Sequence, residues 1–172
     1  MPPVGFSAAT VLDQVKAGAT LQAIADAHSM EEIISAVRDA LTGLRLGVSS
    51  LDEVALHRVA GLELWSIAEI AGHALRMDEA AHAIARSLAV GQQPGVRVPY
   101  GEPGPAGATR DELLEGIHAA EERLAATRVL AAGGPAFAHA ELGELSARGW
   151  ILFIGLHDAA HLHQAAAVVR AR

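Results

Sequence analysis

The chain of 172 residues contains no cysteine. This absence excludes disulfide bonds, thiolate metal ligands and a cysteine nucleophile, so any thiol chemistry would need a thiol supplied by a cosubstrate. Aromatic residues are also scarce, at 3% of the chain, while Ala, Leu, Ile and Val are abundant. That balance favours closely packed helices over a sandwich or barrel built from β-branched and aromatic strands.

Basic charge and long apolar runs are limited as well. The formal net charge is -7 at pH 7, and the 13 Lys and Arg residues are scattered without a run. Such a pattern gives no electrostatic footprint for nucleic acid or for an anionic membrane. No strictly apolar stretch approaches the roughly 20 residues that cross a bilayer, and the N-terminus has no secretory leader pattern. We therefore expect a cytoplasmic protein with neither a nucleic-acid nor a membrane partner.

Length and hydrophobic content predict a single all-α domain. Hydrophobic residues make up 51% of the 172 residues, which is enough to bury one substantial core. Residues 1–28 are predicted to form an N-terminal helical extension of two short pieces interrupted at Gly18, and residues 29–172 the main domain. Apolar periodicity indicates four principal helices, the number in a four-helix bundle, at about 30–46, 67–89, 110–131 and 147–170.

Capping signals mark where these helices begin. A Ser or Thr side chain can accept a hydrogen bond from a free backbone amide at a helix start, while a Glu three positions later reaches back. Ser146 is a further candidate N-cap, for the last helix. The capping-box spacing, which also predicts a short helical piece after Ser50, occurs at Ser29 with Glu32, Ser50 with Glu53, Ser66 with Glu69, and Thr109 with Glu112.

A long connection separates the second and third principal helices. Residues 90–108, VGQQPGVRVPYGEPGPAGA, are rich in Gly and Pro, which interrupt helices and central strands. Loops of this length often serve as lids or binding loops, or are mobile. A domain boundary is the competing interpretation, although neither flank alone would form a persuasive core. No long alternating strand is evident, and only Val96–Tyr100 is expected to be locally extended.

Two histidines stand four residues apart in the last predicted helix. His157 and His161 share one stripe with the large apolar side chains of WILFIGLHDAAHLHQ, residues 150–164. His73 lies in the middle of a comparable apolar stripe on the predicted helix 67–89. Two imidazoles on successive turns can share one ion, and a facing helix can supply a third ligand. Three neutral nitrogen ligands leave a coordination position open, which is typical of a catalytic metal site.

A structural role is the alternative for these histidines. The chain has nine of them, so a chance pair at this spacing is unsurprising, and a lone core histidine is more often a packing residue than a ligand. Three unpaired imidazoles on apolar stripes would, however, be costly to bury without a common partner. We therefore predict a metal site formed by His73, His157 and His161, with Gln164 and Asp158 as candidates for orienting the ligands.

The remaining histidines are predicted to be structural or exposed. His163 is rotated by about 200° from His161 and should leave the metal-facing stripe. His82 is expected to form a solvated pair with Asp78 on the polar side of its helix. Trp65 and Trp150 are interpreted as core anchors. The other four, which have no predicted ligand role, are His28, His57, His118 and His139.

Two segments carry a resemblance to a known family. WSIAEIAGHALRMDE at 65–79 has a Trp-Ser opening followed by a His, and AHAELGELSARGWILFIGLHDAAHLHQAAAVV at 138–169 has a loop followed by a helix with HxxxH and a Gln. In this order and separation they resemble the DinB-like superfamily of four-helix metalloproteins. The resemblance covers about residues 29–170. The N-terminal extension and the Gly/Pro-rich loop depart from the family pattern.

The resemblance implies both a fold and a type of chemistry. It implies an up-down-down-up bundle with a homodimeric assembly, and it places the family's metal triad, which binds Zn or Ni, on His73, His157 and His161. Characterised relatives, maleylpyruvate isomerase among them, use low-molecular-weight thiols such as bacillithiol or mycothiol, and others are described as metal-dependent hydrolases. We expect a thiol-dependent transferase or isomerase acting on a small molecule. A metal-dependent hydrolase and a non-enzymatic dimeric helical ligand-binding module are the alternatives.

Overall fold

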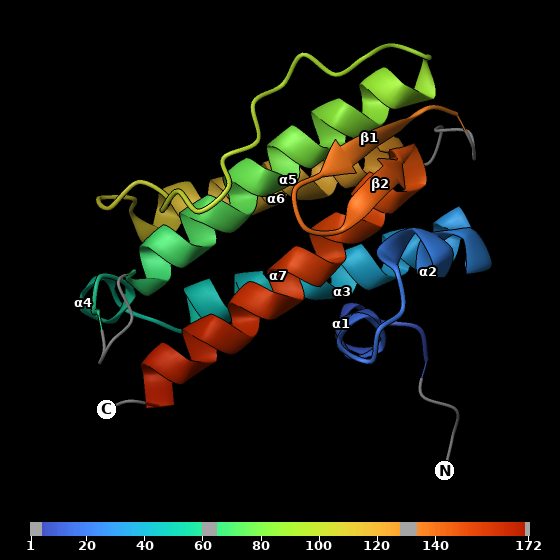
Figure 1. The fold of residues 1–172 in the computed structure, drawn as a ribbon. Helices are drawn as coiled ribbons and strands as arrows, with labels where there is room; N and C mark the ends of the chain where they lie inside the picture. The colour runs from blue at the N-terminus through green and yellow to red at the C-terminus, as the bar shows by residue number, and fades with distance from the viewer. Residues whose placement is uncertain (1–4, 60–64, 128–133, 171–172) are drawn as a thin grey trace.

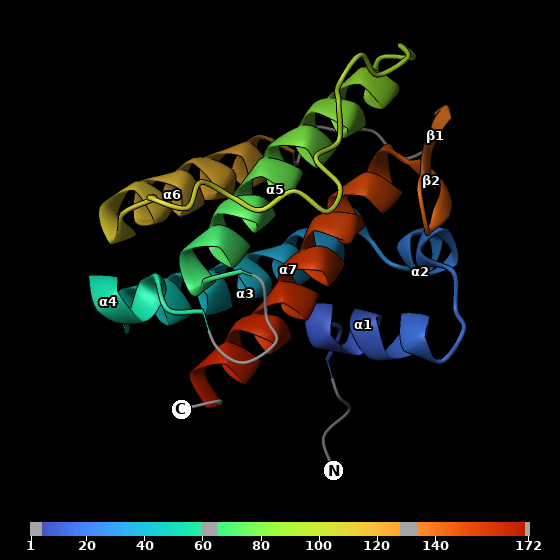
Figure 2. The ribbon, with the colours of Figure 1, turned by 60° about the vertical axis from the view of Figure 1, so that its left-hand side comes forward.

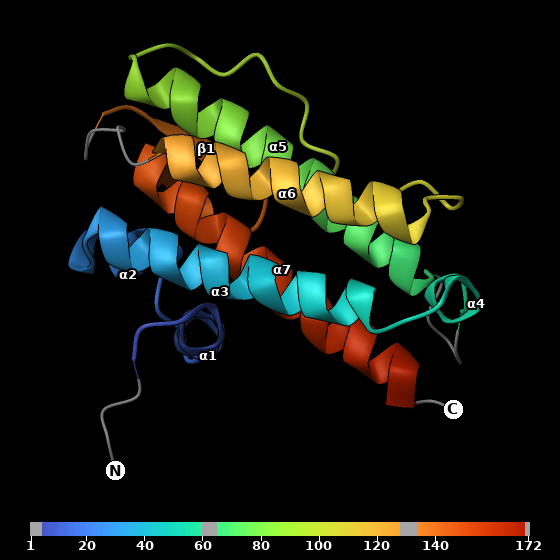
Figure 3. The ribbon, with the colours of Figure 1, turned by 180° about the vertical axis from the view of Figure 1, so that it is seen from behind.

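Four long helices form the body of the protein. The computed structural model describes residues 5–59, 65–127 and 134–170. Figure 3 shows α3 and α7 running in one direction and α5 and α6 in the other, which is the predicted up-down-down-up order. The predicted all-α four-helix-bundle fold is therefore confirmed. The four helices are α3 (Met30–Ser49), α5 (Ile67–Ala89), α6 (Arg110–Ala126) and α7 (Ala147–Arg170).

The predicted helix bounds hold for two of the four helices. Those of α5 and α7 agree with the structure, but α3 continues past residue 46 to Ser49, where the Ser50 amide still donates to Leu46 O at 3.1 Å. Helix α6 ends at Ala126, ahead of the predicted 131, and residues 128–133 lie outside the described part of the chain. None of the described helices is both long enough and apolar enough to cross a membrane.

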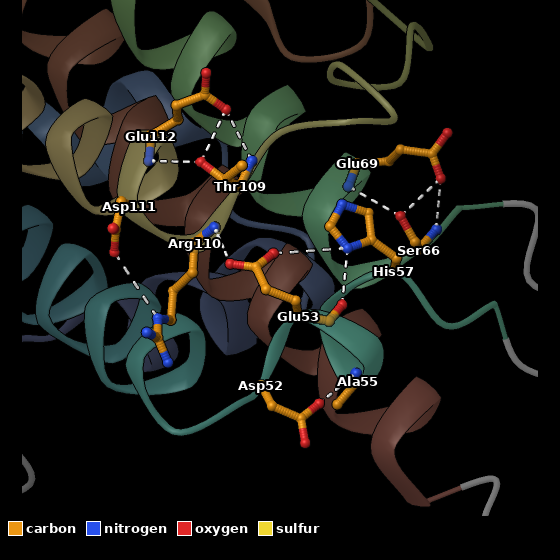
Figure 4. Close-up of polar contacts among 10 residues, drawn as sticks. All are labelled: Asp52, Glu53, Ala55, His57, Ser66, Glu69, Thr109, Arg110, Asp111 and Glu112. Atoms are coloured by element: carbon orange, nitrogen blue, oxygen red, sulfur yellow. Dashed lines mark hydrogen bonds and ion pairs between the residues drawn. The ribbon is translucent and has the colours of Figure 1, made fainter.

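Capping contacts fix the helix starts and join the short helix α4 (Glu53–Leu56) to the bundle (Figure 4). The boxes at Ser29, Ser66 and Thr109 form as predicted, each with its Glu. The expected cap at Ser50 is wrong, because Asp52 caps α4 instead, its Oδ1 accepting from the Ala55 amide at 2.8 Å. Glu53 Oε1 then accepts from the Arg110 amide at 3.0 Å, which ties α4 to the start of α6.

The core is organised around α7. Its first half is buried on nearly all sides, from Ala147 through Leu156, as expected of a helix that neighbours enclose completely. Figure 2 shows α7 running between α5 and two short N-terminal helices, α1 (Ala8–Lys16) and α2 (Leu21–Ala27). Both short helices are confirmed, with Gly18 between them at φ 98°. They contribute Val11 and Leu21 to the same apolar cluster as α7.

A β-hairpin precedes α7 where the sequence analysis predicted only a loop. Strands β1 (Ala136–His139) and β2 (Gly143–Ser146) pair antiparallel, with Ala136 opposite Ser146 and His139 opposite Gly143. Strands of four residues are too short to produce a recognisable alternating pattern, so hydrophobic periodicity missed them. Ser146 nevertheless caps α7 as predicted, since its Oγ accepts from the Gly149 amide at 3.3 Å.

Truncation of Trp150 should destabilise the fold strongly. The side chain is fully buried, and its indole N–H donates to Phe137 O at 3.2 Å, so Trp150→Ala removes apolar contacts and leaves a cavity. We expect a loss of about 3–5 kcal/mol in the free energy of unfolding, measured by urea denaturation. The control Leu46→Ala, at a side chain 63% exposed, should change this free energy by less than about 0.5 kcal/mol. Equal losses would contradict the packing described.

Candidate metal centre

Three imidazoles from two helices meet at one point. Helix α5 supplies His73, and α7 supplies His157 and His161 from successive turns. His157 Nε2 lies 3.2 Å from His73 Nε2 and 3.1 Å from His161 Nε2. One ligand atom from each residue lies within 4.8 Å of the other two, so the group could hold a metal ion. The structure thus brings together the three histidines that the sequence analysis selected.

Hydrogen bonds at the outer ring nitrogens fix which nitrogen of each flanking imidazole faces the cluster. His73 Nδ1–H donates to Glu102 O at 2.6 Å, and His161 Nδ1–H donates to Gln164 Oε1 at 2.8 Å. Because a neutral imidazole carries one proton, both rings present an unprotonated Nε2 to His157. Gln164 therefore stands where an orienting residue was predicted, on the outer nitrogen of His161.

A shared cation would satisfy the three facing Nε2 atoms better than hydrogen bonds among them can. A proton on His157 Nε2 could be donated to only one of its two neighbours, and the other lone pair would then face an N–H it cannot use. The pKa of each of the three is lowered to about 4, mainly by burial, and for His73 and His161 the charge of His157 contributes to this lowering. At neutral pH all three are unprotonated ligands, the form that a divalent ion requires.

The Gly/Pro-rich loop is fastened to α5 beside His73. Figure 1 shows this connection returning along α5. The Gly104 amide donates to Glu69 O at 2.9 Å, and Arg76 Nη1 donates to Pro103 O at 3.2 Å. A Cβ on Gly104 would lie 2.6 Å from the backbone of Gly72, so only glycine permits this approach. The segment that includes Glu102 is therefore packed in place, and its carbonyl is held on His73.

An ion cluster strengthens the same segment. The Glu102 carboxylate accepts from Arg76 Nη2 at 3.3 Å and also pairs with Arg97 of the loop. Each of these exposed ion pairs contributes little to stability, but the two hold Glu102 from both α5 and the loop. Arg76 follows His73 by nearly one helical turn, so it joins the ligand-bearing part of α5 to the residue whose carbonyl orients the ligand.

A buried polar cluster lies behind His157 and corrects the expectation for His82. Asp78 and His82 were predicted to form a solvated pair, yet both are buried, because α6 covers this side of α5. Arg123 of α6 donates to Asp78 Oδ1 through Nε at 3.2 Å and Nη2 at 2.9 Å. His82 Nδ1 stands 3.3 Å from the same oxygen. The pattern of residues along α5 alone could not indicate that α6 covers this side of it.

Asp158 belongs to that interior side and not to the outer nitrogen of His157. Its Oδ1 is 3.8 Å from His157 Nδ1, beyond hydrogen-bond distance, and neither carboxylate oxygen has a hydrogen bond among the described residues. Burial raises the pKa of Asp158 well above its usual range, and the charge of Asp78 adds to the rise. The predicted orienting role therefore has no direct contact to support it.

The other histidines are placed by their surroundings. His163 is exposed, as predicted, and His118 is exposed beside Glu121 and Glu122. His28 and His57 stand at the C-terminal ends of α2 and α4. His139, predicted to be structural or exposed, is structural: it lies in β1, is 7% exposed, and accepts hydrogen bonds at Nδ1 from the hairpin turn.

A cavity of about 410 Å³ adjoins the three imidazoles. Its walls come from α1, α5, the loop, the hairpin and α7, and they are mostly apolar. Trp65, predicted to be a core anchor, is half-buried against an apolar cluster and also lines this cavity, with its ring centre 5.0 Å from that of His73. Apart from the three imidazoles, the lining residues are Leu12, Val15, Trp65, Met77, Tyr100, Gly101, His139, Glu141, Leu142, Phe153, Leu156 and Ala160.

Sequence reasoning missed the polar members of this wall. Tyr100 comes from the loop, His139 from β1 and Glu141 from the hairpin turn, and in none of these does helical periodicity indicate which way a side chain points. The one usable signal was Gly143, which takes φ 76° at the end of the turn and is a residue type typical of hairpins.

Gly104→Ala should weaken metal binding without touching a ligand. The added methyl group forces the loop away from Gly72, which withdraws the Glu102 carbonyl from His73. We expect the Zn affinity to fall about 10- to 100-fold, measured by competition with a chelator, with the helical circular dichroism retained. Gly107→Ala is the matched control, since no atom lies within 4 Å of its Cβ position. Unchanged affinity in Gly104→Ala would refute the positioning role.

The metal-free protein should lose stability as the pH falls from 6.5 towards 4. The three imidazoles have a folded-state pKa of about 4 against an ordinary histidine value of 6.5, so in this window the unfolded chain binds protons that the folded chain does not. Thermal melts at successive pH values should show the midpoint falling across this window. In the His157→Ala variant the decline should be shallower, and an identical slope would contradict the assignment.

Comparisons with known proteins agree with this architecture. The DinB superfamily model matches residues 16–165, which include all three histidines. The solved structure titled as the crystal structure of TT2238, a four-helix bundle protein, aligns with a TM-score of 0.65 at 18% identity, covering 81% of this chain and 99% of that one. No curated protein sequence gives a match. On the family match over most of its length, the chain belongs to the DinB superfamily.

Proposed function

We propose that the protein is a divalent-metal-dependent enzyme in which His73, His157 and His161 hold a Zn or Ni ion at the wall of a small-molecule cavity. The observation that carries the proposal is the convergence of three unprotonated imidazoles beside an apolar cavity of about 410 Å³. Such an ion keeps an uncompensated positive charge and an open position, so it supplies Lewis acidity and favours the deprotonated form of a thiol or water.

The chain's own residues orient the ligands and surround them with mostly apolar walls. Glu102 and Gln164 fix the two flanking imidazoles, and the apolar walls leave little for solvent to bind. The protein contributes no cysteine, so no thiolate of its own competes for the open position. Together with the family resemblance, this supports transfer or isomerisation that uses a low-molecular-weight thiol as cosubstrate.

Hydrolysis is the second candidate, and Glu141 is the observation that favours it. A hydrolase needs a general base near the reacting water, and the helical stripes offered no carboxylate for that role. The structure places Glu141 on the cavity wall, from the turn between β1 and β2. Its carboxylate could accept a proton from a water that enters the cavity.

Metal binding separates this proposal from a structural role for the histidines. We expect untagged protein to bind one Zn or Ni ion per chain, and His157→Ala to reduce the affinity at least 100-fold, because it removes the central one of the three nitrogens. His163→Ala is the control, since this exposed side chain leaves the cluster intact. Isothermal titration calorimetry measures both. Equal losses in the two variants would contradict the site.

Parallel assays separate the two reaction classes. S-transfer from bacillithiol, mycothiol or glutathione to electrophilic acceptors should respond to metal loading if the first candidate holds, whereas metal-dependent ester or amide hydrolysis favours the second. Full metal occupancy without activity in any of them would replace the enzymatic proposal by a ligand-binding module. The homodimer stays a prediction, and sedimentation velocity of the full chain tests it.

A further inference from the structure

The described part of the cavity wall carries acidic but no Lys or Arg charge. Among the described residues that line the cavity there is no Lys or Arg, and Glu141 is the only carboxylate. Burial lowers the pKa of His139, which disfavours its cationic form. Beyond the metal ion itself, the described wall residues therefore offer no Lys or Arg charge to pair with an anionic group of a ligand. Burying a second carboxylate or a phosphate there would leave it without a partner, which is costly.

Glu141 is held at the wall by the hairpin. Its backbone amide donates to Nδ1 of the buried His139 at 3.1 Å, which anchors the turn. No salt bridge or hydrogen bond uses its carboxylate within the part of the chain that the structure describes. Tyr100 lines the same cavity as Glu141, and its pKa is raised by burial and, to a smaller extent, by the Glu141 carboxylate.

Aromatic faces surround the same space. Trp65, Tyr100 and Phe153 all line the cavity, and Phe153 packs against His157 with ring centres 5.2 Å apart. The face of an aromatic ring attracts a cation, and it also accepts an apolar body. A carboxylate with aromatic neighbours and no basic residue is a setting that favours an amine over an anion.

We propose that the cavity takes a small molecule with an apolar or aromatic body, an amine or other cationic group directed to Glu141, and no more than one anionic atom, which the metal holds. This inference rests on the proposed metal site. Glu141 is exposed, so the cavity reaches solvent at this end, and the carboxylates of a polyanionic cosubstrate would stay outside in water. Glu141 is accordingly a specificity-determining residue for the proposed reaction.

Three thiols with the same benzyl body test the proposal. Benzyl mercaptan, its 4-aminomethyl derivative and its 4-carboxy derivative are titrated into cobalt-loaded full-length protein, and binding is followed by the thiolate-to-cobalt absorption band. We expect the amine to bind about fivefold more tightly than the neutral thiol, and the carboxylate to bind most weakly. Because Glu141 is exposed, the differences should shrink at high salt.

Two matched variants assign the preference to one side chain. Glu141→Gln should bind the three thiols with nearly equal affinity, while Glu144→Gln, an equal change of charge on the exposed part of β2 away from the cavity, should keep the full preference. Tightest binding of the carboxylate, or an unchanged order in Glu141→Gln, overturns the inference alone. The cobalt spectrum without thiol reports the metal site separately, and failure of cobalt to bind overturns the proposed function as well.

Discussion

The structure depends on one constraint, which is that three neutral imidazoles face one another between α5 and α7. Each is at least partly buried and has a pKa of about 4, and the lone pairs of His73 and His161 cannot both be satisfied by His157. A shared cation removes this conflict. The surrounding contacts orient the imidazole rings so that the three Nε2 atoms face one point.

Two kinds of support maintain that arrangement. On α5, the close approach of Gly72 and Gly104 lets the loop deliver a backbone carbonyl to His73, and Arg76 fastens the same segment. On α7, an apolar first half fills the bundle interior and fixes the register of the two ligands against α5. The ion pair between the buried Asp78 and the half-buried Arg123 joins α5 to α6 behind the site. Residues far apart in the sequence therefore determine together where the three Nε2 atoms lie.

Helical periodicity predicted most of the fold and all three imidazoles, because it indicates which side chains of a helix face inward. It failed where burial comes from a neighbour outside the helix, as with His82 beneath α6, and where the chain is not helical, as with Tyr100 and Glu141. The close contact of Gly104 was equally hidden, since it depends on two backbones meeting across 32 positions of sequence, from 72 to 104. The three proposed metal ligands could thus be predicted from the sequence, whereas most residues of the cavity wall could not.

The central claim is that the three Nε2 atoms bind one ion. Anomalous diffraction from crystals of untagged protein, recorded on both sides of the absorption edge of the metal found in it, tests this most directly. We expect a single strong peak at about 2.0–2.1 Å from Nε2 of His73, His157 and His161, with Nδ1 of His73 still donating to Glu102 O. A metal-free site in protein supplied with Zn or Ni, or a peak bound elsewhere, would contradict it.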